Sequence, residues 1–100
     1  MALLDDAARL PGEMGRDLVL KVDAIVAGVH FFADDPPADI AWKALAVNLS
    51  DLAAKGATPR GFLLALALPP DWTEDWLAAF SRGLHAGADA TGCRCWAATP

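Results

Sequence analysis

The segment Asn48-Leu49-Ser50-Asp51-Leu52-Ala53-Ala54-Lys55-Gly56-Ala57 decides the expected fold, because it has the pattern of a helix that stops at a glycine. Lys55 suits the negative end of the helix dipole, and Gly56 can take the left-handed conformation that ends many helices. The same helix carries one carboxylate, Asp51, among leucines and alanines. An ionised carboxylate among core residues is costly to bury without a partner. Asp51 is therefore the first candidate for a functional residue.

Other aspartates lie upstream of this helix, at Asp5, Asp6 and Asp23, whereas the nearby cationic residues are single and scattered. Oxygen-only clusters suit magnesium that is bound together with substrate phosphates. The sequence therefore favours a metal ion as the partner of Asp51. Asn48 lies three positions before Asp51 and is expected to project toward the same ligand. Two plainer interpretations stay open: an Asp-Asp pair is typical of a solvated turn, and Asp23 can simply end a strand.

Composition limits the class of protein. One hundred residues correspond to a single small domain, able to bury roughly 60–70% of its unfolded surface. With 55% hydrophobic residues, the chain is too apolar to be disordered. The net charge of −5 and the pI near 4.6 provide no basic stripe, which argues against nucleic acid or a membrane as a partner. A phosphorylated ligand would need bridging cations.

The sequence shows no targeting or membrane segment. Its longest strongly apolar run, residues 62–68, has seven residues, far fewer than the ~20 that span a bilayer. The N-terminus lacks the basic segment and apolar core of a signal peptide. We therefore expect a cytoplasmic protein in which Cys93 and Cys95 are reduced thiols, because a lone Cys-x-Cys is poor evidence for zinc.

The hydrophobic pattern predicts strands and helices on one sheet. The first helix is expected to be capped by Asp34 or Asp35, and the second to begin with a capping box formed by Asp71 and Glu74. This order of elements is typical of an α/β or α+β domain. The expected elements are a strand over 18–22, a second β-prone segment over 24–32, a helix over 38–55, a buried strand over 59–68 and a helix from 71 to about 88.

Three ordered blocks of the sequence resemble the amino-terminal part of thiamine-phosphate kinase. They are Asp5-Asp6-Ala7-Ala8, the segment from Asp23 to Phe31, and the segment from Lys43 to Pro59. The resemblance extends from about Leu3 to Gly92, which is nearly the whole chain.

The resemblance implies the N-terminal domain of the aminoimidazole ribonucleotide synthetase-like fold, with a mixed sheet and helices on one face. It implies ATP-dependent phosphorylation of thiamine monophosphate to thiamine diphosphate, with ATP as co-substrate and Mg²⁺ ions held by aspartates. Carried over by motif, Asp6, Asp23 and Asp51 are metal ligands and His30 faces the substrate. Members of the family form homodimers, and a carboxy-terminal α/β domain completes their site. Read without the resemblance, His30 is equally an ordinary part-buried histidine.

The chain departs from the family just before Asp23. The family usually has hydroxyl residues there, and this sequence has Lys21 and Val22. These two side chains offer no hydroxyl oxygen to a metal, although a backbone carbonyl there could still serve. We predict that Lys21 instead supplies the charge of one cation.

A second departure begins after Cys93. The family continues with a strand into Leu-Gly-Gly-Asp-Thr, which contacts nucleotide phosphates and metal, whereas residues 95–100 read Cys-Trp-Ala-Ala-Thr-Pro. The codons CTG CTG GGC GGC GAC ACC, read from their second nucleotide, encode this sequence. We therefore expect an N-terminal domain over 1–93, an aberrant tail over 94–100 produced by a frame shift, and an absent C-terminal domain. Such a chain is expected to be inactive alone, to expose apolar faces and to self-associate.

Two other functions remain open on the sequence. One is another ATP-dependent member of the same superfamily, from hydrogenase maturation, selenophosphate synthesis or purine synthesis. The other is a non-catalytic dimerisation module. The block around His30 and the Asn-Leu-Ser-Asp segment favour the thiamine enzyme.

Overall fold

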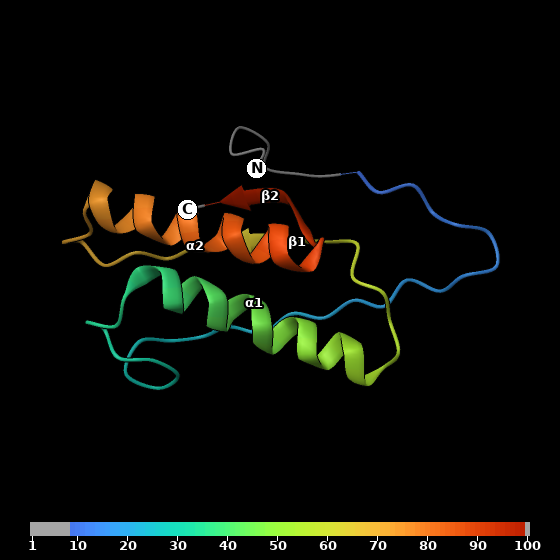
Figure 1. Ribbon diagram of the computed structural model, residues 1–100, viewed down its shortest axis with the longest axis horizontal. Helices are drawn as coiled ribbons and strands as arrows, with labels where there is room; N and C mark the ends of the chain where they lie inside the picture. Colours follow the sequence, from blue (N-terminus) through green and yellow to red (C-terminus); the bar gives the residue numbers. More distant parts are fainter. Residues whose placement is uncertain (1–8, 100) are drawn as a thin grey trace.

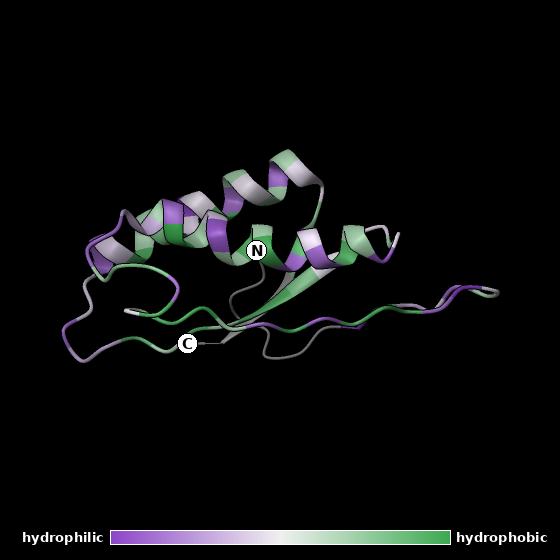
Figure 2. Cartoon of the chain, turned by 90° about the horizontal axis from the view of Figure 1, so that it is seen from below, coloured by the Kyte–Doolittle hydropathy of each residue, from purple (hydrophilic) through white to green (hydrophobic). Residues whose placement is uncertain are grey.

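The computed structural model describes residues 9–99, with side chains up to residue 95. Within them the order of elements is α1 (Pro37–Ala54), β1 (Gly61–Ala65), α2 (Glu74–Thr91) and β2 (Arg94–Thr99). The two helices lie side by side (Figure 1). The turned view shows the small sheet and the extended chain before α1 together below them (Figure 2). Neither described helix is long and apolar enough to cross a bilayer. The predicted α/β class is confirmed.

The bounds of helix α1 differ by one residue from the predicted range 38–55, and the helix ends before Gly56 as predicted. The N–H of Ala57 donates to the carbonyl of Leu52, and the N–H of Gly56 donates to that of Ala53. This is the Schellman pattern, which needs a left-handed residue, and Gly56 has φ 70°. The expected aspartate cap at the other end is wrong. Pro36 holds that position without a side-chain hydrogen bond, because the Asp35 carboxylate accepts from the N–H of Phe32 instead.

Helix α2 begins and ends about three residues later than predicted. Thr73 is its N-cap, and its hydroxyl oxygen accepts a hydrogen bond of 3.1 Å from the N–H of Trp76. The predicted Asp71 and Glu74 capping box is therefore wrong, because Glu74 is already the first helical residue. A threonine with extended backbone, here φ −120°, is a favourable cap.

The core lies where α1 crosses α2. Ile40 and Ala41 of α1 and Phe80 and Leu84 of α2 are buried together. Phe80 also stacks on Trp76, with ring centroids 5.3 Å apart. The helices meet where α2 carries Gly83, which is itself buried. The core is therefore formed mainly between the helices, and Phe62 and Leu64 of β1, with Leu66 just after that strand, pack against it.

The sheet in the described residues is a parallel pair, β1 with β2. Its register is irregular, because Phe62 pairs with Cys95 and Leu63 with Ala97. Residues 94–99, expected as an aberrant tail, thus form a strand of the sheet. The prediction of a buried strand over 59–68 is only partly right: Phe62 and Leu64 are half-buried, but Leu63 is 68% exposed. The helices cover one face only.

The segment before α1 does not form the two strands expected there. Among the described residues it contributes one isolated bridge, between Ala27 and Phe31. Leu20 and Val22 are 83% and 92% exposed. Figure 2 shows this segment extended below the helices, with hydrophobic residues along it. A strand is stable only when a neighbouring strand satisfies its backbone groups, and the described chain gives this segment no such neighbour.

Candidate functional site

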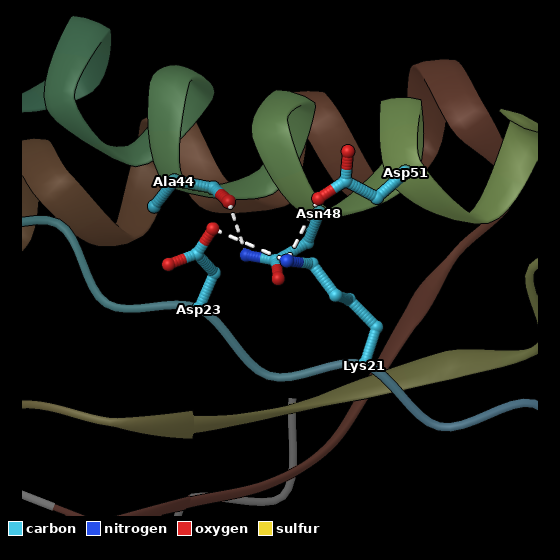
Figure 3. A network of polar contacts seen from close by, with 5 residues as sticks. All are labelled: Lys21, Asp23, Ala44, Asn48 and Asp51. Atoms are coloured by element: carbon cyan, nitrogen blue, oxygen red, sulfur yellow. Dashed lines mark hydrogen bonds and ion pairs between the residues drawn. The ribbon is translucent and has the colours of Figure 1, made fainter.

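The extended segment and α1 meet at a charged cluster formed by Lys21, Asp23 and Asp51. The Lys21 Nζ atom lies 2.7 Å from Asp51 Oδ2 and 3.2 Å from Asp23 Oδ2. Figure 3 shows the lysine side chain rising from the extended segment to α1, with one aspartate from each element beside its ammonium group. Residues 28 positions apart in the sequence are thereby joined through one cation.

The cluster is open to solvent on one side. The side chain of Lys21 is 27% exposed, and those of Asp23 and Asp51 are 51% and 55% exposed. The hydrogen bond to Asp51 first, and that to Asp23 second, raise the pKa of Lys21 above 10.5. The ammonium form is thus firmly held at neutral pH.

The expectation that Asp51 lies among core residues is wrong. Leu52 and Leu49 beside it are only half-buried, because the buried residues of α1 lie in its first half, at Ile40, Ala41 and Leu45. The last turns extend past that contact, so the Asp51 carboxylate faces the ammonium group and solvent.

Asn48 lies next to this cluster on α1 (Figure 3). Its Nδ2 atom donates a 2.8 Å hydrogen bond to the Ala44 carbonyl one turn earlier. Its Oδ1 atom is buried and has no hydrogen-bond partner among the described residues. A buried acceptor without a donor costs about 1–3 kcal/mol. Asn48 thus offers an unused oxygen three residues from Asp51.

The donor atoms of this site suit a hard cation. Two carboxylates and one amide oxygen are the ligand types that magnesium takes, and the carboxylates already share one positive charge. Asp6, the third predicted metal ligand, and its neighbour Asp5 lie outside the described residues. Among residues 9–99 no three acidic, histidine or cysteine side chains come close enough to hold a metal together. The described part of the chain therefore supplies two of the three predicted carboxylates.

His30 lies in a tight loop before α1. Its Nδ1 atom accepts a 2.8 Å hydrogen bond from the N–H of Val26. The N–H of Gly28 donates to the Phe31 carbonyl at 2.7 Å, which closes the loop. The imidazole is exposed, and residues 28–32 line a shallow hollow of about 120 Å³ beside it. Nε2 is thus the ring nitrogen left for a ligand.

The sequence did not predict that Lys43 holds this loop against α1. The Lys43 ammonium, on α1, donates a hydrogen bond to the His30 carbonyl. The two residues are thirteen positions apart, and no local pattern predicts a contact at that separation.

Comparison with known proteins gives a consistent result. The family model described as AIR synthase related protein, N-terminal domain, matches residues 4–97. Thiamine-monophosphate kinase of Synechococcus elongatus is 54% identical over 81 residues, which cover 80% of this chain and 25% of that protein. The enzyme of the same name from Escherichia coli K12 is 54% identical over 80 residues, covering 80% of this chain and 24% of the relative.

A solved structure agrees with the sequence relatives. The crystal structure of thiamine monophosphate kinase from Aquifex aeolicus superposes with a TM-score of 0.69 at 32% identity, over 72% of this chain and 25% of that one. This chain therefore spans about a quarter of the length of the relatives it matches.

Proposed function

Because the chain belongs to the AIR synthase related family and carries its N-terminal domain, we propose that it is the N-terminal part of a thiamine-monophosphate kinase. The reaction is the ATP-dependent phosphorylation of thiamine monophosphate to thiamine diphosphate. ATP is the co-substrate, Mg²⁺ is the cofactor and the cytoplasm is the place of action. The identity of 54% to relatives bearing that name is the observation that carries the proposal.

The charged cluster supports this chemistry. Phosphoryl transfer depends mainly on positioning and on neutralising charge across the phosphates. In the proposed enzyme Asp6, Asp23 and Asp51 hold Mg²⁺, which neutralises phosphate charge. Helix α1 fixes the position of Asp51, and in the chain without metal Lys21 holds Asp23 close to Asp51.

His30 is proposed to contact the phosphate or thiazole end of thiamine monophosphate. The hydrogen bond from the Val26 N–H fixes the ring through Nδ1, and Nε2 remains open to a ligand. The loop is further held to α1 through Lys43. A rigid, exposed imidazole beside a hollow is suited to positioning a substrate group.

The kinase proposal is tested with a chimera, since the Synechococcus elongatus relative is about four times as long as the matched region. Residues 4–92 of this chain replace the matching part of the Synechococcus elongatus relative. We expect thiamine diphosphate to form with ATP, Mg²⁺ and thiamine monophosphate. Asp51→Asn in the chimera should lower kcat by about a hundredfold, because Mg²⁺ ligation is weakened. A folded chimera that makes no thiamine diphosphate would contradict the proposal.

The 100-residue chain by itself is proposed to be inactive and to bind its own copy. The exposed apolar side chains of Leu18, Leu20 and Val22 support self-association. This observation also favours the second candidate function, a non-catalytic dimerisation module. Size-exclusion chromatography combined with a thiamine monophosphate binding assay separates the two. A dimer that binds no thiamine monophosphate with Mg²⁺ present would support the module.

A further inference from the structure

The position of the Lys21 ammonium group is unusual for a site meant to hold metal. It lies at hydrogen-bond distance from both carboxylates, 2.7 Å from Asp51 Oδ2 and 3.2 Å from Asp23 Oδ2. A magnesium ion binding the same oxygens would need to approach to about 2.0–2.1 Å. One cation occupies the space between the two oxygens, so the ammonium group and a divalent ion cannot both be there.

We propose that Lys21 is a built-in counterion that competes with a divalent cation for Asp23 and Asp51. A divalent ion reaches these carboxylates only by displacing the ammonium group, so the chain binds that ion more weakly than it would with a neutral residue at position 21. This inference rests on the proposed function, which makes the two aspartates metal ligands.

The local structure favours exchange over a permanent ion pair. Lys21 belongs to an extended segment that makes no strand pairing within the described residues, and all three side chains are partly open to water. Exposed ion pairs are individually weak. The Lys21 side chain can therefore move away from the two carboxylates without disrupting a packed core.

Asn48 provides a second observation at the same place. Its buried Oδ1 atom lacks a hydrogen-bond donor among residues 9–99, and Lys21 does not satisfy it although it lies beside the cluster (Figure 3). The amide oxygen therefore stays without a donor while the ammonium group is held by the two carboxylates.

The first experiment measures Mn²⁺ binding to the full chain by titration calorimetry. We expect Lys21→Met and Lys21→Thr to lower the Kd for Mn²⁺ by about three- to tenfold, and Lys21→Arg to leave it within about twofold. Lys55→Met is the matched control. It removes the same charge from a residue outside the cluster, and its Kd should stay within about twofold of the unmodified chain.

Several outcomes of the titration would overturn the inference. Equal Kd values for the unmodified chain and both neutral variants would show that Lys21 does not compete. An equal gain in Mn²⁺ affinity in Lys55→Met would show that only the net charge of the chain determines the Kd. If Asp51→Asn weakens Mn²⁺ binding in both backgrounds while Lys21→Met changes nothing, the metal role of the aspartates stands and the inference alone falls. If Asp51→Asn changes nothing in either background, the metal role falls and the inference falls with it.

A second experiment needs no variant. Acylation of individual lysines is followed by mass spectrometry with and without Mg²⁺ at fixed pH and ionic strength. Displacement by Mg²⁺ should free the Lys21 amine and speed its acylation about threefold or more relative to Lys55. An unchanged ratio at Mg²⁺ concentrations that saturate the chain would contradict the competition.

Discussion

A Cβ atom on Gly83 would lie 2.5 Å from the Cα atom and 2.7 Å from the carbonyl oxygen of Ala38. The two helices thus touch backbone to backbone at this point, and only a residue without a side chain fits. The charged cluster depends on this contact, because the position of α1 on α2 determines where Asp51 meets the extended segment.

Replacing Gly83 by alanine should destabilise the domain. The contact is with backbone atoms, which cannot rotate away, so the helices must separate at a cost of about 1–3 kcal/mol. The gain in helix propensity of ~1 kcal/mol offsets only part of this. We expect a net loss of up to about 2 kcal/mol in the free energy of unfolding, measured by urea denaturation.

Gly87 provides the control on the same helix. There a Cβ atom would meet the Cδ2 atom of Leu45 at 2.9 Å, the flexible end of a side chain. Gly87→Ala should therefore change the free energy of unfolding by less than about 1 kcal/mol. Equal losses in the two variants would contradict the close helix contact.

Thr73→Ala should remove the N-cap of α2. The N–H of Trp76 loses its 3.1 Å acceptor, which typically costs about 1 kcal/mol. Chemical denaturation followed by helical circular dichroism measures the effect. Asp71→Ala tests the sequence-based capping box and should have little effect. If Asp71→Ala were the more damaging change, the assignment of Thr73 as cap would be wrong.

Cys93 should react slowly with thiol reagents. It is 1% exposed, and burial first, with the neighbouring Cys95 second, raises its pKa above 9.0. The reactive thiolate is thus scarce at neutral pH. In a Cys95→Ser background, reaction with a disulfide reagent at about pH 8 should be much slower in the folded chain than in denaturant.

The raised pKa of Cys93 also makes the stability of the folded chain depend on pH. A thiol whose pKa is raised on folding contributes stability below its unfolded pKa and loses it as pH rises through the folded value. The free energy of unfolding should therefore fall above about pH 9 more steeply in this chain than in Cys93→Ala. Parallel pH profiles for the two would contradict the burial of the Cys93 thiol.

The gene should carry a displaced motif. We expect the nucleotides that encode residues 95–100 to encode Leu-Gly-Gly-Asp-Thr when they are translated in a neighbouring reading frame, as the codon comparison predicts. The strand β2, which these residues help to form, pairs irregularly with β1: Cys95 faces Phe62 and Ala97 faces Leu63. Sequencing of this region decides the matter, and a gene without the motif in any frame would refute the frame shift.

The amino-acid sequence by itself determined the parts of the fold that depend on local chemistry. The bounds of α1 were predictable because Gly56 and Pro37 act on their own backbone, and the apolar run at 62–68 marked β1 in the same way. The chemistry-bearing residues were also visible, since an aspartate in a leucine-rich helix stands out from its neighbours.

Only the tertiary structure decided which groups meet. Val22 and Leu20 have strand-forming side chains, yet strand formation requires a partner that local sequence does not specify. Asp51 was expected to be buried, but its exposure depends on where α2 stops covering α1. The two ion pairs that link Asp23 to Asp51 through Lys21 likewise depend on how the extended segment lies against α1. No sequence periodicity relates these residues.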